Sequence, residues 1–266
     1  MPIDELPGTL SSDMRTAFER GYQYGIEHHD FFKTEYIKAE DLIKILKAHF
    51  PTQTTYVRHV LFAVFFYGLS TALKERTTED VPLRYRATQA KMGSLCLLHL
   101  TEFYRRITVN RSRHLFYTMC PKHKASSPRE WEIYCSGALG VALIIQAINR
   151  QGWSVYHPTP YEDVTCKIDL FAIDPSCEFG LCLQIKTRKN GIVSLIMEHP
   201  DPNQTSHGTF LSGVRKFTPL HPDVQWIPLF VTISLPNLAI DPQAIHPAIE
   251  DVIRETLAFY ILEEET

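Results

Sequence analysis

The sequence lacks the cysteine patterns that mark metal-binding or disulfide-stabilised proteins. No Cys-x-x-Cys pair and no repeated spacing occurs among its six cysteines, at positions 96, 120, 135, 166, 177 and 182. This argues against a cysteine-ligated metal site. In a chain without a secretion signal, the thiols are expected to be reduced and mostly buried.

Signals for secretion, for a membrane and for a globally basic surface are also missing. The first residues, Met1 to Glu5, are acidic and lack the basic and apolar regions of a signal peptide. The most apolar run, Val60 to Leu69, is far shorter than the ~20 residues of a membrane span. Because the formal net charge is −3, any surface that binds nucleic acid must be local. We expect a cytoplasmic, globular protein without a membrane-bound part.

The N-terminal half has the apolar spacing of helices and contains no visible repeat. Ser12 or Asp13 is placed to cap a first helix, and Thr34 to cap a second. The third, 54–75, is apolar nearly all round, as is typical of the central helix of a bundle. A fourth is expected over 87–108. The sequence therefore predicts an all-α domain over residues 1–125.

The second half alternates between helix and strand patterns. Ser127 as N-cap, Pro128 at the first helical position and Glu130 three residues after the cap predict a helix that runs to about Arg150. The remaining segments predict, in order, a strand at 152–156, a central hairpin with an extension at 191–197, a helix from about Thr209, a strand at 224–235 and a helix at 243–263. The order α-β-β-β-α-β predicts an α/β domain over residues 126–266, with a mixed sheet flanked by helices.

The central hairpin carries the chemistry. Two apolar runs, one containing Asp169 and the other Gln184-Ile185-Lys186, are joined by the turn-rich segment 174–178. A turn centred between Ser176 and Cys177 places residue 169 opposite residue 184. Lys186 then shares a face with Gln184, because side chains alternate along a strand. An acid, an amide and an ammonium group are thus expected to converge.

The spacing Asp-x14-Gln-Ile-Lys, within this order of elements from Ser126 to Leu235, resembles the PD-(D/E)XK nuclease superfamily. The Gln-x-Lys variant is similar to Mrr-type restriction endonucleases and to the endonuclease subunit of heteromeric transposases. The resemblance implies a restriction-endonuclease-like core and a metal-dependent nuclease activity that cuts DNA. A single domain of this type cuts one strand, so a double-strand cut implies a protein partner or a second copy of the chain.

The expected metal is Mg²⁺ or Mn²⁺, which takes hard oxygen ligands. Asp169 would supply a carboxylate, Gln184 its side-chain carbonyl where most relatives have Glu, and Ile185 its main-chain carbonyl. Lys186 would orient the attacking water and stabilise developing negative charge. With Gln184, the site has one negative charge fewer and should hold the metal more weakly.

Relatives also place a glutamate on the first helix of the core. Glu130 and Glu132 are both candidates, since the capping box can occupy Glu130 and Glu132 points roughly the other way. Asp163 is more simply a loop acid. His157 and His199 are more simply incidental histidines.

The stretch from Thr101 to Arg129 is locally basic and interleaved with aromatic residues. Its candidate phosphate contacts, together with two residues just after the hairpin motif, are Arg105, Arg106, Arg111, Arg113, Lys122, Lys124, Arg188 and Lys189. The alternative is an exposed linker whose charges only keep it soluble.

The sequence thus favours a Mg²⁺-dependent DNA endonuclease of defence, recombination, transposition or repair. In this reading the helical domain positions the nuclease domain on DNA or on a protein. Two other hypotheses remain. One is a catalytically inactive nuclease-fold protein that serves as a DNA-binding or assembly module, in which Gln184 replaces the glutamate of an active site. The other is a helical interaction module beside an incidental α/β domain.

Overall fold

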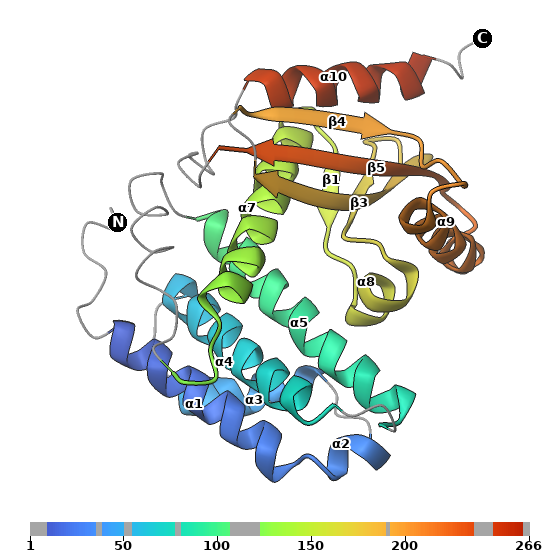
Figure 1. The fold of residues 1–266 in the computed structure, drawn as a ribbon. Helices are drawn as coiled ribbons and strands as arrows, with labels where there is room; N and C mark the ends of the chain where they lie inside the picture. The colour runs from blue at the N-terminus through green and yellow to red at the C-terminus, as the bar shows by residue number, and fades with distance from the viewer. Residues whose placement is uncertain are drawn as a thin grey trace. The chain divides into compact units, whose positions relative to one another are not determined.

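The computed structural model describes residues 10–35, 39–50, 55–77, 81–106, 123–189, 192–236 and 247–262. The fold is mixed α/β, with an N-terminal helical region followed by a sheet core, as the sequence predicts (Figure 1). The chain divides into two compact units between Cys135 and Ser136, inside one helix. We call the described residues up to Cys135 unit 1 and those from Ser136 on unit 2. The sequence-based boundary lies at residue 126.

Unit 1 is built from helices. Their bounds are α1 Leu10–Glu27, α2 Phe31–Thr34, α3 Ala39–His49, α4 Thr55–Glu75 and α5 Leu83–Tyr104, followed by the first turns of α7, Pro128–Arg150. Helix α4 is buried along nearly all of its length, which confirms the predicted central helix. The second predicted helix corresponds to α3. The prediction that Thr34 caps it is wrong, because Thr34 is the last residue of α2. Helix α5 begins before predicted residue 87, directly after Pro82.

Helices α1 and α4 pack through glycines. A Cβ atom on Gly21 would lie 2.0 Å from the main-chain oxygen of Phe65, and one on Gly68 would lie 2.4 Å from that of Phe18. Both contacts are with backbone, which cannot move aside cheaply. The two glycines therefore allow an approach that no other residue would permit at these positions.

Unit 2 contains a five-stranded sheet in the order β1-β2-β3-β5-β4. The bounds of its elements after α7 are β1 Ser154–Tyr156, α8 Pro160–Cys166, β2 Leu170–Ile173, β3 Phe179–Lys189, β4 Ser194–Glu198, α9 Thr205–Phe217, the short 3₁₀ helix η1 Thr218–Leu220, β5 Gln225–Leu235 and α10 Pro247–Leu262. Strands β3 and β5 run parallel, and the other neighbours are antiparallel. The predicted mixed sheet with helices is confirmed, but the observed core contains one helix and one strand that the predicted order α-β-β-β-α-β lacks.

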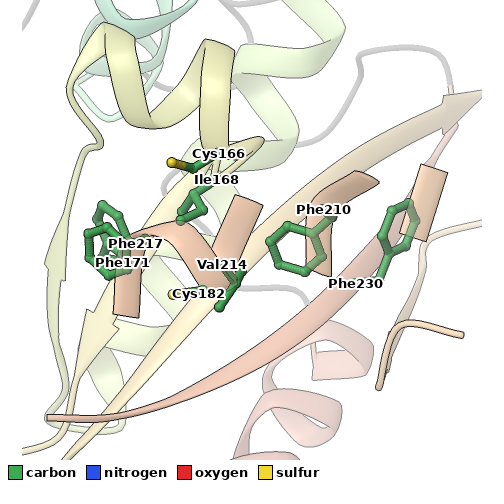
Figure 2. Close-up of a cluster of buried hydrophobic side chains, with 8 residues drawn as sticks. All are labelled: Cys166, Ile168, Phe171, Cys182, Phe210, Val214, Phe217 and Phe230. Carbon is green, nitrogen blue, oxygen red and sulfur yellow. The ribbon is translucent and has the colours of Figure 1, made fainter. Parts of the chain in front are cut away.

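The two faces of the sheet are covered by different helices. A Cβ atom on Gly140 of α7 would lie 2.3 Å from Oγ1 of Thr187 and 3.0 Å from Cγ2 of Ile233, so α7 packs closely on the face that carries these side chains. The opposite face meets α9 through a buried cluster of Cys166, Ile168, Phe171, Cys182, Phe210, Val214, Phe217 and Phe230 (Figure 2). Alternation along β3 therefore assigns Gln184 and Lys186, like Cys182, to the α9 face.

Two elements of unit 2 differ from the prediction. Helix α8 lies in the segment around Asp163 that was expected to be a loop, and Thr159 and Glu162 close a reciprocal capping box at its start. Strand β4 lies at the sheet edge and pairs with β5, so the stretch predicted as an extension of the hairpin is a separate strand.

Helix α7 is the one helix in the described ranges that is long and apolar enough to cross a membrane. Of its most apolar window, 67% is buried inside the protein. A buried core helix meets the same criteria of length and composition, so the pattern is weak evidence for a membrane span.

Candidate active site

The central hairpin has the predicted register. Leu170 pairs with Leu183 and Ile173 with Gly180, which is the alignment that places residue 169 opposite residue 184. The register prediction is confirmed because the connecting turn is centred between Ser176 and Cys177. Cys177 has a positive φ of 65° there.

The side chain of Asp174 holds this turn. Its carboxylate accepts hydrogen bonds from the main-chain N–H groups of Ser176 and Phe179, both at 2.9 Å, and from the hydroxyl of Ser176. Burial alone would raise the pKa of Asp174, but these hydrogen bonds outweigh it and lower the pKa below its ordinary value. The turn is thereby pinned by an ionised carboxylate, and with it the register of the two strands.

Asp169 stands at the point where the β2–β3 ladder ends. Its main-chain N–H donates to the carbonyl oxygen of Leu183 at 2.8 Å. The N–H of Ile185, in β3, donates to Oδ2 of the Asp169 side chain at 2.6 Å. A side-chain oxygen thus takes the place that a main-chain carbonyl of β2 would have in a continued ladder. The other oxygen, Oδ1, makes no hydrogen bond to the described residues. The carboxylate is thus fixed by one oxygen, and the other remains available to a ligand.

The carboxyl group of Asp169 titrates near neutrality. Burial raises its pKa from an ordinary value of 3.8 to about 7. The positive charge of Lys186 and the N–H of Ile185 act in the opposite direction, whereas the negative charge of Asp163 raises the pKa further. Lys186 and Asp163 therefore both lie close enough to Asp169 to act on its charge. Strongly perturbed acids of this kind concentrate at functional sites.

Gln184 is nearly buried and has no protein partner. Its exposed fraction is 6%, and its amide makes no hydrogen bond within the described part of the chain. Lys186, two residues further on the same face, is exposed. Buried amides are hydrogen-bonded in the great majority of proteins. The Gln184 amide has no such partner among the described residues, but its atoms are not fully buried, so a ligand can reach them next to the exposed ammonium group of Lys186.

Three oxygen donors in this region match the chemistry of a hard cation. They are Oδ1 of Asp169, the side-chain oxygen of Gln184 and the carbonyl oxygen of Ile185. In an extended strand, the N–H and C=O of one residue point the same way, so the Ile185 carbonyl faces the side on which its N–H meets Asp169. No group of three His, Cys, Asp or Glu side chains placed to hold a metal occurs in the described residues. The expected ligand set contains only one such side chain, and its oxygens fit Mg²⁺ or Mn²⁺ in kind.

Glu130 and Glu132 belong to unit 1, whereas the hairpin belongs to unit 2. Only half of the predicted capping box forms: Glu130 N–H donates to Oγ of Ser127 at 3.3 Å, but the Glu130 carboxylate bonds Nζ of Lys74 at 2.9 Å. The N–H of Ser127 donates instead to the hydroxyl of Tyr67. The prediction of a complete capping box is therefore wrong, because a lysine from α4 holds the glutamate.

The predicted phosphate contacts are only partly covered by the structure. Arg111, Arg113 and Lys122 lie outside the described residues. Arg105 and Arg106 both bond the carboxylate of Glu102, at 2.7 and 3.1 Å. Lys124, Arg188 and Lys189 are exposed.

The remaining candidate acid and histidines fall into different settings. Asp163 is not in a loop but in α8, and its charge acts on Asp169. His157 is partly buried between β1 and α8, and His199 is exposed just after β4.

One residue near the site was not predicted. His207 is 4% exposed, and its ring lies against that of Phe230, with 3.9 Å between the ring centroids. Phe230 is the β5 neighbour of Gln184 on the same face. The sequence had placed the start of this helix near Thr209, which left His207 in a loop. The sequence pattern that could have placed His207 in this helix is the spacing of the buried residues Phe210, Val214 and Phe217, which extends back by one turn to residue 207.

Comparison with known proteins adds no identification. No protein-family model, no curated protein and no solved structure matches this chain. The function is therefore argued from the chemistry of the hairpin.

Proposed function

We propose that this protein is a metal-dependent endonuclease that hydrolyses phosphodiester bonds of DNA, with a restriction-endonuclease-like core of the Gln-x-Lys type. The observation that carries the proposal is the fixed carboxylate of Asp169. It accepts a hydrogen bond from the main-chain N–H of Ile185, and the charge of Lys186 lowers its pKa, at the end of the β2–β3 ladder. An acid with a pKa near 7 beside a lysine and an unpaired amide is expensive to maintain, which favours a catalytic role over a structural one.

The residues divide the work in a simple way. Asp169, Gln184 and the carbonyl of Ile185 would hold Mg²⁺ or Mn²⁺ through oxygen atoms. A bound divalent ion of this kind lowers the pKa of water and neutralises charge on the phosphate. Lys186 orients the attacking water and stabilises the negative charge that develops on the phosphate oxygens. Asp169 must lose its proton before it can bind a cation, so activity should favour pH values above 7.

The partners follow from the same chemistry. DNA is the substrate, and Arg105, Arg106, Lys124, Arg188 and Lys189 are the described residues proposed to contact its phosphates. A second copy of the chain or another protein is needed where both strands are cut. Defence, recombination, transposition and repair are the processes that use such an activity, and each takes place where DNA is, inside the cell.

A plasmid nicking assay tests the proposal. The full chain is incubated with supercoiled plasmid and Mg²⁺ or Mn²⁺ at pH 8, where Asp169 is ionised. The wild type is expected to convert the plasmid to the open circle, and Lys186→Ala to lose about a hundredfold in rate. Lys47→Ala, an exposed lysine of α3, is the matched control and should cut like the wild type. Wild-type nicking no greater than that of Lys186→Ala or of a chelator control would refute the enzyme.

One observation favours a second candidate function. The described residues hold no cluster of three acidic, histidine or cysteine side chains, and Gln184 stands where a carboxylate would bind metal more strongly. A nuclease-fold protein that binds DNA or assembles with another protein without cutting would have this composition. It predicts DNA binding that neither Mn²⁺ nor Lys186→Ala changes.

A further inference from the structure

His207 has a tautomer fixed by the backbone. The main-chain N–H of Asp201 donates to Nδ1 of His207 at 3.0 Å. Nδ1 must then carry the lone pair, so the proton of the neutral ring lies on Nε2. No described residue accepts a hydrogen bond from that Nε2–H.

The His207 ring and the Gln184 side chain both neighbour Phe230. Gln184 and Phe230 are direct neighbours across β3 and β5, on the face that α9 covers. The His207 ring lies on Phe230. Phe230 belongs to the buried cluster of that face (Figure 2). Adjacent parallel strands are about 4.8 Å apart. His207 and Gln184, both more than nine-tenths buried, therefore neighbour the same residue, Phe230, and neither the Gln184 amide nor the His207 Nε2–H has a partner among the described residues.

The surroundings of His207 favour an anion. It is the third residue of α9, a helix whose N-cap residue, Gln204, makes no side-chain capping bond. The first turn of a helix presents main-chain N–H groups and the positive end of the helix dipole. The Nε2–H donor in the same turn suits an oxygen anion, whereas a cation would find no acceptor on this ring.

We infer that His207 is a substrate-contacting residue, whose Nε2–H donates a hydrogen bond to a non-bridging phosphate oxygen of the nucleic-acid backbone. This inference rests on the proposed function, since it takes the phosphate to be the one that a metal ion at Asp169 and Gln184 would hold. His207 transfers no proton in this role. It binds the phosphate from the side of α9, while Lys186 acts from the exposed end of β3.

Two substitutions separate the two nitrogens of the ring. His207→Gln keeps a donor near the position of Nε2, and His207→Asn keeps an acceptor near the position of Nδ1 for the N–H of Asp201. His207→Asn is expected to lower kcat/KM for plasmid nicking roughly tenfold to a hundredfold, the range of one hydrogen bond to a charged group. His207→Gln should retain most of the activity. A merely structural histidine gives the opposite order, because its only protein hydrogen bond is through Nδ1, and that result would overturn the inference.

A binding measurement keeps the inference separate from catalysis. The ring nitrogens of histidine-labelled wild-type protein are followed by NMR while thymidine bisphosphate, which has no phosphodiester bond to cut, is added with Mg²⁺. The Nε2 resonance of His207 should shift, while that of His221, at the other end of α9, should not. An unmoved His207 resonance overturns the inference even where plasmid is cut. A shifted resonance in a protein that never nicks plasmid supports the phosphate site and refutes the endonuclease.

Discussion

The main-chain N–H of Ile185 donates to Oδ2 of Asp169 at 2.6 Å, at the end of the β2–β3 ladder. A side-chain carboxylate thus takes the place of a main-chain acceptor at the edge of β3. The carboxyl group gains one hydrogen bond and loses most of its water, and the loss dominates, because its pKa rises to about 7. Keeping this acid ionised costs folding free energy, which gives the site a signature that stability measurements can detect.

Asp169→Asn should stabilise the metal-free protein at high pH. Because the folded-state pKa is raised, ionisation opposes folding as pH rises from the ordinary value of 3.8 and does so fully above about 7. Between pH 5 and pH 8 this carboxyl group should cost the wild type about 2–3 kcal/mol of unfolding free energy. Asparagine has no such ionisation and can still accept the N–H of Ile185. Urea unfolding at both pH values, in the presence of a chelator, measures the difference.

The same variant should be inactive in the plasmid assay. If the variant is more stable than the wild type at pH 8 and no longer cuts, then the wild-type protein keeps Asp169 for activity at a cost in stability. Equal pH dependence of the unfolding free energy in Asp169→Asn and the wild type would show that Asp169 is solvated, and would remove the strongest support for the site.

Gln184→Glu should tighten metal binding. A second carboxylate adds negative charge beside Asp169 and an oxygen ligand of the type Mg²⁺ and Mn²⁺ prefer. We expect a roughly tenfold lower Kd for Mn²⁺ at pH 8, measured by calorimetry. In the double variant Asp169→Asn/Gln184→Glu, the Kd should return to about the wild-type value, because a single carboxylate is then left. An unchanged Kd would mean that Gln184 does not face the cation.

The hairpin was predictable because local chemistry fixes its register. Turn residues from Asp174 to Glu178 and apolar strands on either side leave one alignment that buries both runs. Helix α7 was equally accessible from its N-cap, its proline and its long apolar run, and its observed bounds, Pro128–Arg150, agree with the prediction. These features depend on residues close together in the sequence.

The features that could not be predicted depend on distant residues or on short elements. Lys74 of α4 captures the Glu130 carboxylate, which no pattern around residue 130 reveals. Helix α8 has only seven residues, too few for a periodic apolar pattern, although its capping box at Thr159 and Glu162 was visible. His207 becomes notable only when β5 places Phe230 beside Gln184.

Neutralising Arg105 and Arg106 tests the basic segment. Both arginines bond Glu102, and partly exposed ion pairs of this kind contribute less than about 1 kcal/mol to stability, so the double change to Gln should fold normally. If they contact phosphates, DNA affinity should fall and the slope of log affinity against log salt should decrease by about one for each lost contact. Arg15→Gln, which breaks the Arg15–Glu19 pair in α1, is the matched control. Unchanged affinity and slope in the double variant would leave the segment as a soluble linker.

Gly140→Ala should strain the face of the sheet behind the site. The new Cβ would lie 2.3 Å from Oγ1 of Thr187, the residue after Lys186, and we expect a loss of about 1–3 kcal/mol in unfolding free energy. Oγ1 of Thr187 is buried without a hydrogen bond to the described residues, so Thr187→Ala alone should cost little and should restore most of the stability in the double variant. Gly93→Ala in α5 is the control, because its Cβ would meet the terminal hydroxyl oxygen of Tyr134 at 2.9 Å, an atom on a flexible side chain. Additive losses in the Gly140 and Thr187 double variant would contradict the close packing of α7 on β3.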